Sequence, residues 1–198
     1  TVKNGCSLTG RLANETENGE LATSTTTLNN GSKLVVNGQN GMDLGYEGYG
    51  VLNIDANSTF EATENYGIAA NGTMNVNGGN VKVAGKLTNN GTMDVATESN
   101  VEVTGDLNVN GTLNSAGNIT GAIVKAEEGT IQLTGGIYTT EPQEGWCAEN
   151  YGAFPYDETS WIVREVYGTQ TIALQAGWNW MSSYISTFDG EGGLQFLE

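Results

Sequence analysis

The sequence contains no histidine, and this absence removes several kinds of catalytic and metal site. Ser-His-Asp and Cys-His nucleophiles need an imidazole base, and the usual zinc triads need imidazole ligands. The two cysteines, Cys6 and Cys147, lie far apart in the chain, so neither a metal cluster nor an intrachain disulfide is expected. Glycine-rich phosphate and dinucleotide motifs followed by a helix are missing as well. We therefore expect no metal, no cofactor and no enzymatic activity.

Positive charge is also scarce, since seven Lys and Arg residues face 23 Asp and Glu residues, for a net charge of −16. Such a field repels nucleic acid and anionic membrane surfaces, so we expect neither as a partner. No apolar run approaches the ~20 residues of a membrane-spanning helix. The chain does not begin with a signal peptide, so an exported protein would be seen here as a mature form or a fragment.

Proline is nearly absent and glycine is frequent, with 2 and 29 of 198 residues, which is typical of tight turns and not of collagen. The glycines mark a repeat of about twenty residues, whose openings are spaced 19, 22, 19, 20 and 18 residues apart. The opening residues are Gly31, Gly50, Gly72, Gly91, Gly111 and Gly129. Four of them follow an asparagine, and Asn-Gly favours tight corners because both residues tolerate positive φ.

Each repeat contains short segments in which apolar and polar residues alternate, the pattern of a strand with one buried face. Met74 and Val76 occupy the same slots as Met93 and Val95 one repeat later. We therefore predict an all-β fold, a single-stranded right-handed parallel β-helix of about six coils over residues 31–138. The variable period favours the right-handed form over the left-handed one, which usually repeats strictly at 18. A Greek-key β-sandwich is the alternative, but it does not explain the recurring slots.

The two ends are expected to differ from the repeats. Residues 1–30 are interpreted as an N-terminal cap and irregular first coil, because terminal repeats must cover the open core. Residues 139–167 hold both prolines and two of the four tryptophans, and are interpreted as an aromatic-rich closing hairpin. Residues 168–198 are interpreted as the truncated start of a further β-rich module, so that the chain is part of a longer polypeptide.

Two segments carry a resemblance to known proteins. GGIYTTEPQEGWCAENYGAFPYDETSWIV resembles a closing segment of repetitive surface proteins from gut bacteria. The matching residues are Gly135, Gly136, Tyr138, Thr140, Pro142, Tyr151 and Trp161. QTIALQAGWNWMSSYI is similar to the start of a module frequent in Bacteroidetes surface proteins, through residues 175–180. The resemblance, to repeat-rich adhesin-like β-solenoid proteins, implies an extracellular or cell-surface location and no particular activity.

Acidic residues are the only catalytic candidates left. Asp94, Glu102 and Asp106 occupy outward slots of neighbouring strands, and Asp55, Glu61 and Glu64 lie one or two coils earlier. Some β-helix enzymes cleave polysaccharides with paired carboxylates. Outward polar residues are nevertheless what a solenoid surface requires, and no cluster of cations accompanies these, so we interpret them as a solvated face. A cation site at Asp43 and Glu47 is a further possibility.

Aromatic residues supply the candidate binding site. Tyr46, Tyr49 and Tyr66 lie near Phe60 in one or two neighbouring coils, where their rings could stack on sugars or cover an irregular corner of the core. Two other sequence patterns do not require a binding function. The three Asn-Gly-Thr sequons at 71–73, 90–92 and 110–112 are explained by corner chemistry. A single threonine column, Thr73, Thr92, Thr112 and Thr130, falls short of the paired columns typical of ice binding.

From the sequence we expect a non-enzymatic structural stalk or adhesin-like scaffold of a bacterial surface. Its partner would be a host or matrix glycan or protein. A carbohydrate-binding or carbohydrate-cleaving β-helix protein is the alternative.

Overall fold

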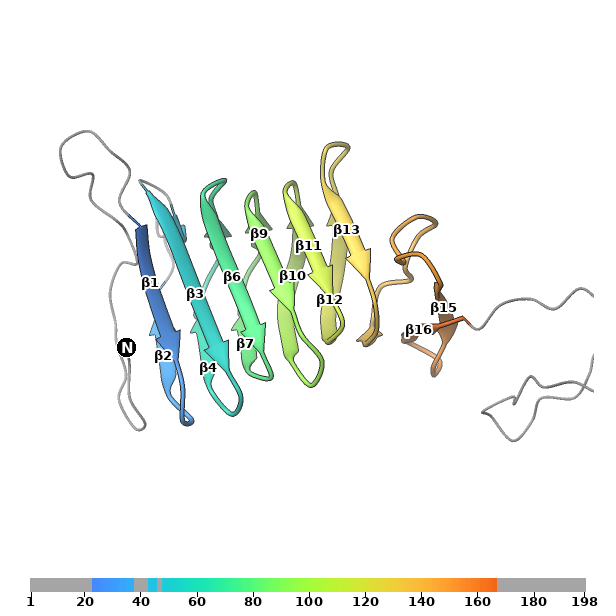
Figure 1. The fold of residues 1–198 in the computed structure, drawn as a ribbon, viewed down its shortest axis with the longest axis horizontal. Coiled ribbons are helices and arrows are strands. Elements are labelled where there is room, and N and C mark those ends of the chain that lie inside the picture. The colour runs from blue at the N-terminus through green and yellow to red at the C-terminus, as the bar shows by residue number, and fades with distance from the viewer. Residues whose placement is uncertain (1–22, 38–42, 46–47, 167–198) are drawn as a thin grey trace, which may run out of the picture. The chain divides into compact units, whose positions relative to one another are not determined.

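A computed structural model describes residues 23–37, 43–45 and 48–166 of the chain. All regular structure in these ranges is β-strand (Figure 1). The described ranges contain no helix long and apolar enough to cross a membrane. The predicted all-β class is therefore confirmed for this part of the chain.

Six parallel strands form one sheet, which we call sheet A, and they follow one another in chain order (Figure 1). They are β1 (Thr23–Leu28), β3 (Tyr49–Asp55), β6 (Gly72–Asn77), β9 (Thr92–Val95), β11 (Thr112–Ser115) and β13 (Thr130–Leu133). Because each strand pairs in parallel with the strand one turn later, the chain returns to the same face after every circuit.

The other strands belong to a second sheet, sheet B, which covers two further faces of each turn. Its strands on the first of these faces are β2 (Lys33–Val36), β4 (Thr59–Ala62), β7 (Asn80–Val83), β10 (Asn100–Val109), β12 (Asn118–Lys125) and β14 (Ile137–Tyr138). The last face holds β5 (Tyr66–Ile68) and β8 (Leu87–Asn89). Strand β10 spans both faces, because its beginning pairs with β7 and its end pairs with β8, and β12 does the same because it pairs with both parts of β10. Three strand segments per turn is the predicted parallel β-solenoid.

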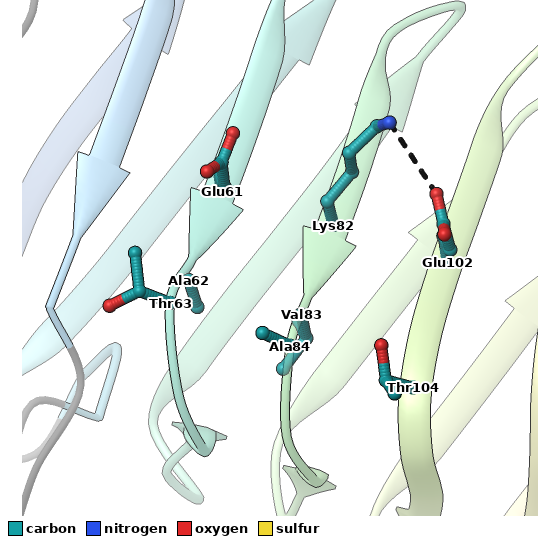
Figure 2. Close-up of a pocket in the computed structure, with 8 residues that line it drawn as sticks. All are labelled: Glu61, Ala62, Thr63, Lys82, Val83, Ala84, Glu102 and Thr104. Atoms are coloured by element: carbon teal, nitrogen blue, oxygen red, sulfur yellow. Dashed lines mark ion pairs between the residues drawn. The ribbon is translucent and has the colours of Figure 1, made fainter.

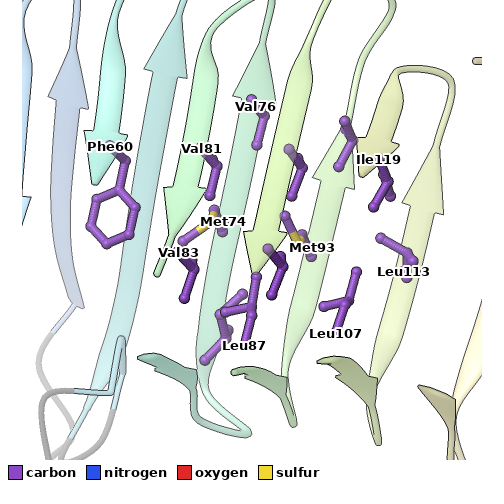
Figure 3. Packing of buried hydrophobic residues seen from close by; sticks show 14 of the residues in the cluster. Phe60, Met74, Val76, Val81, Val83, Leu87, Met93, Leu107, Leu113 and Ile119 are labelled. Carbon is purple, nitrogen blue, oxygen red and sulfur yellow. The ribbon is translucent and has the colours of Figure 1, made fainter. Parts of the chain in front are cut away.

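The core is built from columns of like residues inside the turns (Figure 3). Met74 lies opposite Met93 in the neighbouring turn, and Val76 lies opposite Val95. All four side chains are buried, whereas the residues between them point outward. Alternation along a strand places every second side chain inside, so the predicted inward slots are confirmed.

The first repeat differs from its prediction. Gly31 does not correspond to Gly50, because Ser24 lies opposite Gly50 and Lys33 lies opposite Thr59. Asn30 and Gly31 both adopt positive φ, of 54° and 74°, and form the corner between β1 and β2. The same Asn-Gly chemistry thus serves a different corner of the turn, and spacing alone does not tell the two corners apart.

The solenoid comprises about four turns with strands on all three faces, between β3 and β12. The flanking pairs β1–β2 and β13–β14 are partial turns, so the expected six coils are not confirmed. Strand β1 lies within the segment 1–30 predicted as the N-terminal cap, and residues 1–22 of that segment lie outside the described residues. The predicted module at 168–198 also lies outside them.

After β14, the strands β15 (Tyr151–Pro155) and β16 (Trp161–Glu165) pair antiparallel. Strand β16 pairs antiparallel with β14, so the parallel stacking of sheet B stops there. Trp146 and Val163 are buried and belong to the same hydrophobic cluster as the solenoid core.

Candidate functional site

The outer face of sheet A carries two regular columns of side chains, which are polar except for Val51. One, the Thr column, contains Thr25, Val51, Thr73, Thr92, Thr112 and Thr130. The other, the Asn column, lies two residues further along each strand and contains Thr27, Asn53, Asn75, Asp94, Asn114 and Gln132. Neighbours within a column are about 4.8 Å apart and the columns about 6.6 Å apart, because strand spacing and residue rise set both values.

Hydrogen bonds between turns hold the Asn column in place. The Asn75 amide donates to Asn53 Oδ1 at 2.8 Å, and the Asn114 amide donates to Asp94 Oδ1 at 2.7 Å. Each asparagine has two N–H donors and a carbonyl oxygen with two lone pairs, so a ladder bond leaves capacity for a further partner. Asn110 similarly donates to Asn90 at 2.8 Å at the corner before β9 and β11. The face therefore presents oriented amides beside β-branched threonine hydroxyls.

The three candidate tyrosines are not equivalent. Tyr49 begins β3 on sheet A and is 48% exposed. Tyr66 is buried, with its ring centroid 4.8 Å from that of Phe60, and burial raises the pKa of its phenol well above 10. Tyr66 thus serves the core, and a ligand at the surface can reach Tyr49. Tyr46 lies outside the described residues.

The candidate carboxylates are dispersed over different faces. Asp94 belongs to the Asn column of sheet A, whereas Glu102 lies in sheet B, where Lys82 Nζ is 3.5 Å from its carboxylate. Asp106 is 3.9 Å from Lys86 Nζ in the same way. Asp55 ends β3 opposite Asn77, and Glu64 is exposed beyond the end of β4. Among the described residues, Asp94 and Glu102 are not brought together as an acid pair.

A shallow groove of about 410 Å³ lies on the outer face of sheet B (Figure 2). Glu61, Lys82 and Glu102 form one column along it, and Lys82 leans toward Glu102. Glu61 also pairs with Lys33 at 2.5 Å. The groove is hollow at Ala84 because this small side chain lies between Thr63 and Thr104. Two carboxylates and one ammonium make this groove polar and mixed in charge.

No group of three acidic, histidine or cysteine side chains capable of holding a metal occurs in the described ranges. Of the cation site suggested at Asp43 and Glu47, only Asp43 belongs to the described residues, so this site stays a prediction. Cys147 is a partly buried free thiol whose pKa is raised by burial. Cys6 lies outside the described part. The sequon asparagines Asn71, Asn90 and Asn110 all lie exposed at corners.

Comparisons with protein families, curated proteins and solved structures found no match to this chain.

The Asn column is the feature that the sequence interpretation missed. Its signal is present, because the segments Asn-Gly-Thr-Met-Asn, Asn-Gly-Thr-Met-Asp and Asn-Gly-Thr-Leu-Asn place an amide or carboxylate two residues after each threonine. The predicted Thr column is confirmed, in register from Thr73 to Thr130. It is accompanied by a second polar column and is not isolated.

Proposed function

We propose that this chain is a non-enzymatic structural stalk or adhesin-like scaffold of a bacterial cell surface. The observation that carries the proposal is the ladder of polar bonds and ion pairs that joins successive turns on the outside of a continuous apolar core. Asn75–Asn53 and Asn114–Asp94 tie turns together on sheet A, and Lys82–Glu102 does so on sheet B. The proposal includes right-handed coils, about six in number, an N-terminal cap and closure by the 139–167 segment.

This architecture suits a spacer for a physical reason. Every turn contributes about 4.8 Å along the stacking axis and packs only against its two neighbours. Backbone hydrogen bonds run along that axis on all three faces, so separating two neighbouring turns breaks all the bonds between them. The carboxylates that could serve as catalysts are engaged in ladders or ion pairs, as Asp94, Glu102 and Asp106 show. A display or spacing role needs no cofactor, and we propose none.

Surface location is tested on intact cells of the organism that encodes the protein. Antibodies against residues 49–138 should label unpermeabilised cells, and external protease should abolish the signal while a cytoplasmic marker survives. Labelling that appears only after permeabilisation would contradict the proposal.

The second candidate function, a carbohydrate-cleaving β-helix, is supported by the groove between Glu61 and Glu102. A reducing-sugar assay on neutral and acidic polysaccharides decides between the two. The scaffold proposal predicts no turnover with any substrate. Turnover that disappears in Glu102→Gln or Asp94→Asn, and persists in Glu98→Gln at an exposed corner, would establish an enzyme instead.

A further inference from the structure

The outer face of sheet A differs in charge from the rest of the described surface. Neither of its columns contains a cation, Asp94 is their one carboxylate, and Asp55 adds a second carboxylate where β3 ends on the same face. Sheet B carries Lys33, Lys82 and Lys86 paired with acidic residues. On a chain of net charge −16, a face with few charged side chains is the place where an uncharged partner binds with little charge to desolvate.

The chemistry of this face indicates what it can bind. Threonine hydroxyls and asparagine amides each offer donors and acceptors, as do the hydroxyl groups of a sugar. The ladder bonds at 2.8 and 2.7 Å fix the amides, and β-branching restricts the threonines. A ligand therefore loses little free energy to ordering these side chains on binding. At one end of the face, the exposed ring of Tyr49 adds an apolar surface with a polar tip.

The size of the face argues against a globular protein partner. Six strands about 4.8 Å apart, each with about four residues, give a surface of roughly 24 by 13 Å. Stable protein interfaces bury about 800 Å² per partner around an apolar centre, and this face offers less area and no such centre. A long, narrow polymer fits better, because similar polar pairs recur at successive turns, as Thr73–Asn75, Thr92–Asp94 and Thr112–Asn114 show, and weak contacts add along one molecule.

We infer that the Thr and Asn columns, together with Tyr49, bind a neutral polysaccharide laid across the strands of sheet A. The inference rests on the proposed adhesive role and names its ligand class. Acidic polysaccharides are disfavoured by the net charge of −16. Hydroxyls of the polymer form hydrogen bonds with the threonine hydroxyls. They also bond to the donor and acceptor positions of the asparagine amides that the ladder bonds leave unused.

Affinity electrophoresis of the full chain in gels containing a mixed-linkage β-glucan, a xylan, a mannan or polygalacturonate tests the inference. At least one neutral polymer should retard the protein, and polygalacturonate should not. The double variant Thr92→Ala/Thr112→Ala removes two adjacent hydroxyls and should weaken binding about tenfold, as expected for two neutral hydrogen bonds. Tyr49→Ala should also weaken it.

The matched control is Thr59→Ala/Thr120→Ala, which removes two hydroxyls from outward positions of sheet B and should leave retardation unchanged. Circular dichroism and thermal midpoints verify that all variants fold. If Thr92→Ala/Thr112→Ala does not fold, the single variant Tyr49→Ala tests the inference in its place. Three results would overturn the inference: no retardation by any neutral polymer, equal losses in both double variants, or inhibition of ice recrystallisation as the only activity. None of these bears on cell-surface labelling, so the scaffold proposal stands or falls separately.

Discussion

At the scale of single residues, the solenoid makes equivalent positions comparable, and two buried serines show this. Ser58 and Ser99 precede β4 and β10 in the same column, two turns apart, and both are fully buried. The Ser99 hydroxyl donates to the Val76 carbonyl at 2.7 Å and accepts from the Gly78 N–H at 2.8 Å. The Ser58 hydroxyl has no hydrogen-bond partner.

Ser99→Ala should therefore lower the free energy of unfolding by about 1–3 kcal/mol, since two backbone groups lose their partner. Ser58→Ala should leave it unchanged or raise it, because an unsatisfied buried hydroxyl is removed. Urea unfolding of the two variants beside the parent provides the measurement. A larger loss for Ser58→Ala than for Ser99→Ala would show that these hydrogen bonds are not what stabilises the corner.

Glycine is required where the corners of successive turns approach closely. A Cβ at Gly111 would lie 2.2 Å from the Gly91 carbonyl oxygen, and backbone cannot yield as a side chain can. Gly111→Ala should cost more than about 3 kcal/mol. At Gly145, where φ is +83° and nothing lies within 4 Å, alanine should cost only about 1 kcal/mol of backbone strain. Thermal and urea unfolding should rank the two variants in this order, and equal losses would contradict the steric explanation.

Two buried tyrosines predict a sensitivity of the fold to alkaline pH. Burial is the main reason that the phenol pKa values of Tyr66 and Tyr138 lie well above 10. The folded state therefore retains protons that the unfolded chain releases near pH 10. Stability from this source is constant below about pH 10 and decreases above it, by about 1.4 kcal/mol per pH unit for each tyrosine.

Tyr66→Phe should roughly halve that alkaline slope without loss at neutral pH, because the Tyr66 hydroxyl has no hydrogen-bond partner. Tyr138→Phe should also halve it but cost about 1 kcal/mol at neutral pH, since its hydroxyl bonds to Ser115 Oγ at 2.9 Å and to the Gly135 carbonyl at 2.6 Å. Urea unfolding at a series of pH values up to about 11 measures both effects. An unchanged slope in both variants would assign the alkaline loss to other groups.

At the scale of strands, the sequence predicted the elements better than their register. Alternation identifies inward positions such as Met74 and Met93 because burial demands it at every turn. The prediction misaligns the first repeat because Asn30-Gly31 has the same composition as the Asn-Gly pairs at another corner of the turn. The local sequence does not indicate which of the corners such a pair forms. The Asn column was harder to predict from the sequence. Asn53 and Asn75 become neighbours only when the strands stack, 22 residues apart in the chain.

The aromatic candidates illustrate the same limit. Tyr49 and Tyr66 occur in similar glycine-containing contexts, and their composition does not say which ring points inward. Tyr66 packs beside Phe60 of the preceding strand, whereas Tyr49 takes an outward position in β3. Side chains alternate between inward and outward along a strand, so a ring's direction depends on how many residues separate it from the start of its strand. The sequence does not fix where each strand begins.

At the scale of the whole solenoid, turns should be removable as units. Deleting residues 92–111 joins Gly91 to Thr112, which already occupies the position of Thr92 one turn later. The shortened chain should fold and keep its strand circular dichroism, with lower unfolding free energy and a smaller urea m-value, because stability is a sum over neighbouring turns. Deleting only residues 92–101 removes half a turn and should abolish folding. If both shortened chains folded, or if neither did, the register between stacked turns would not be what determines folding.

The equivalence of successive turns has a consequence for how the gene can change. The registers Thr73–Thr92, Thr92–Thr112 and Thr112–Thr130 differ in length by one or two residues, yet all place threonine on threonine. Corner segments absorb these differences, so unequal recombination between repeats yields a longer or shorter protein that retains its packing. Length thereby becomes a heritable variable that selection can adjust in increments of a single coding repeat.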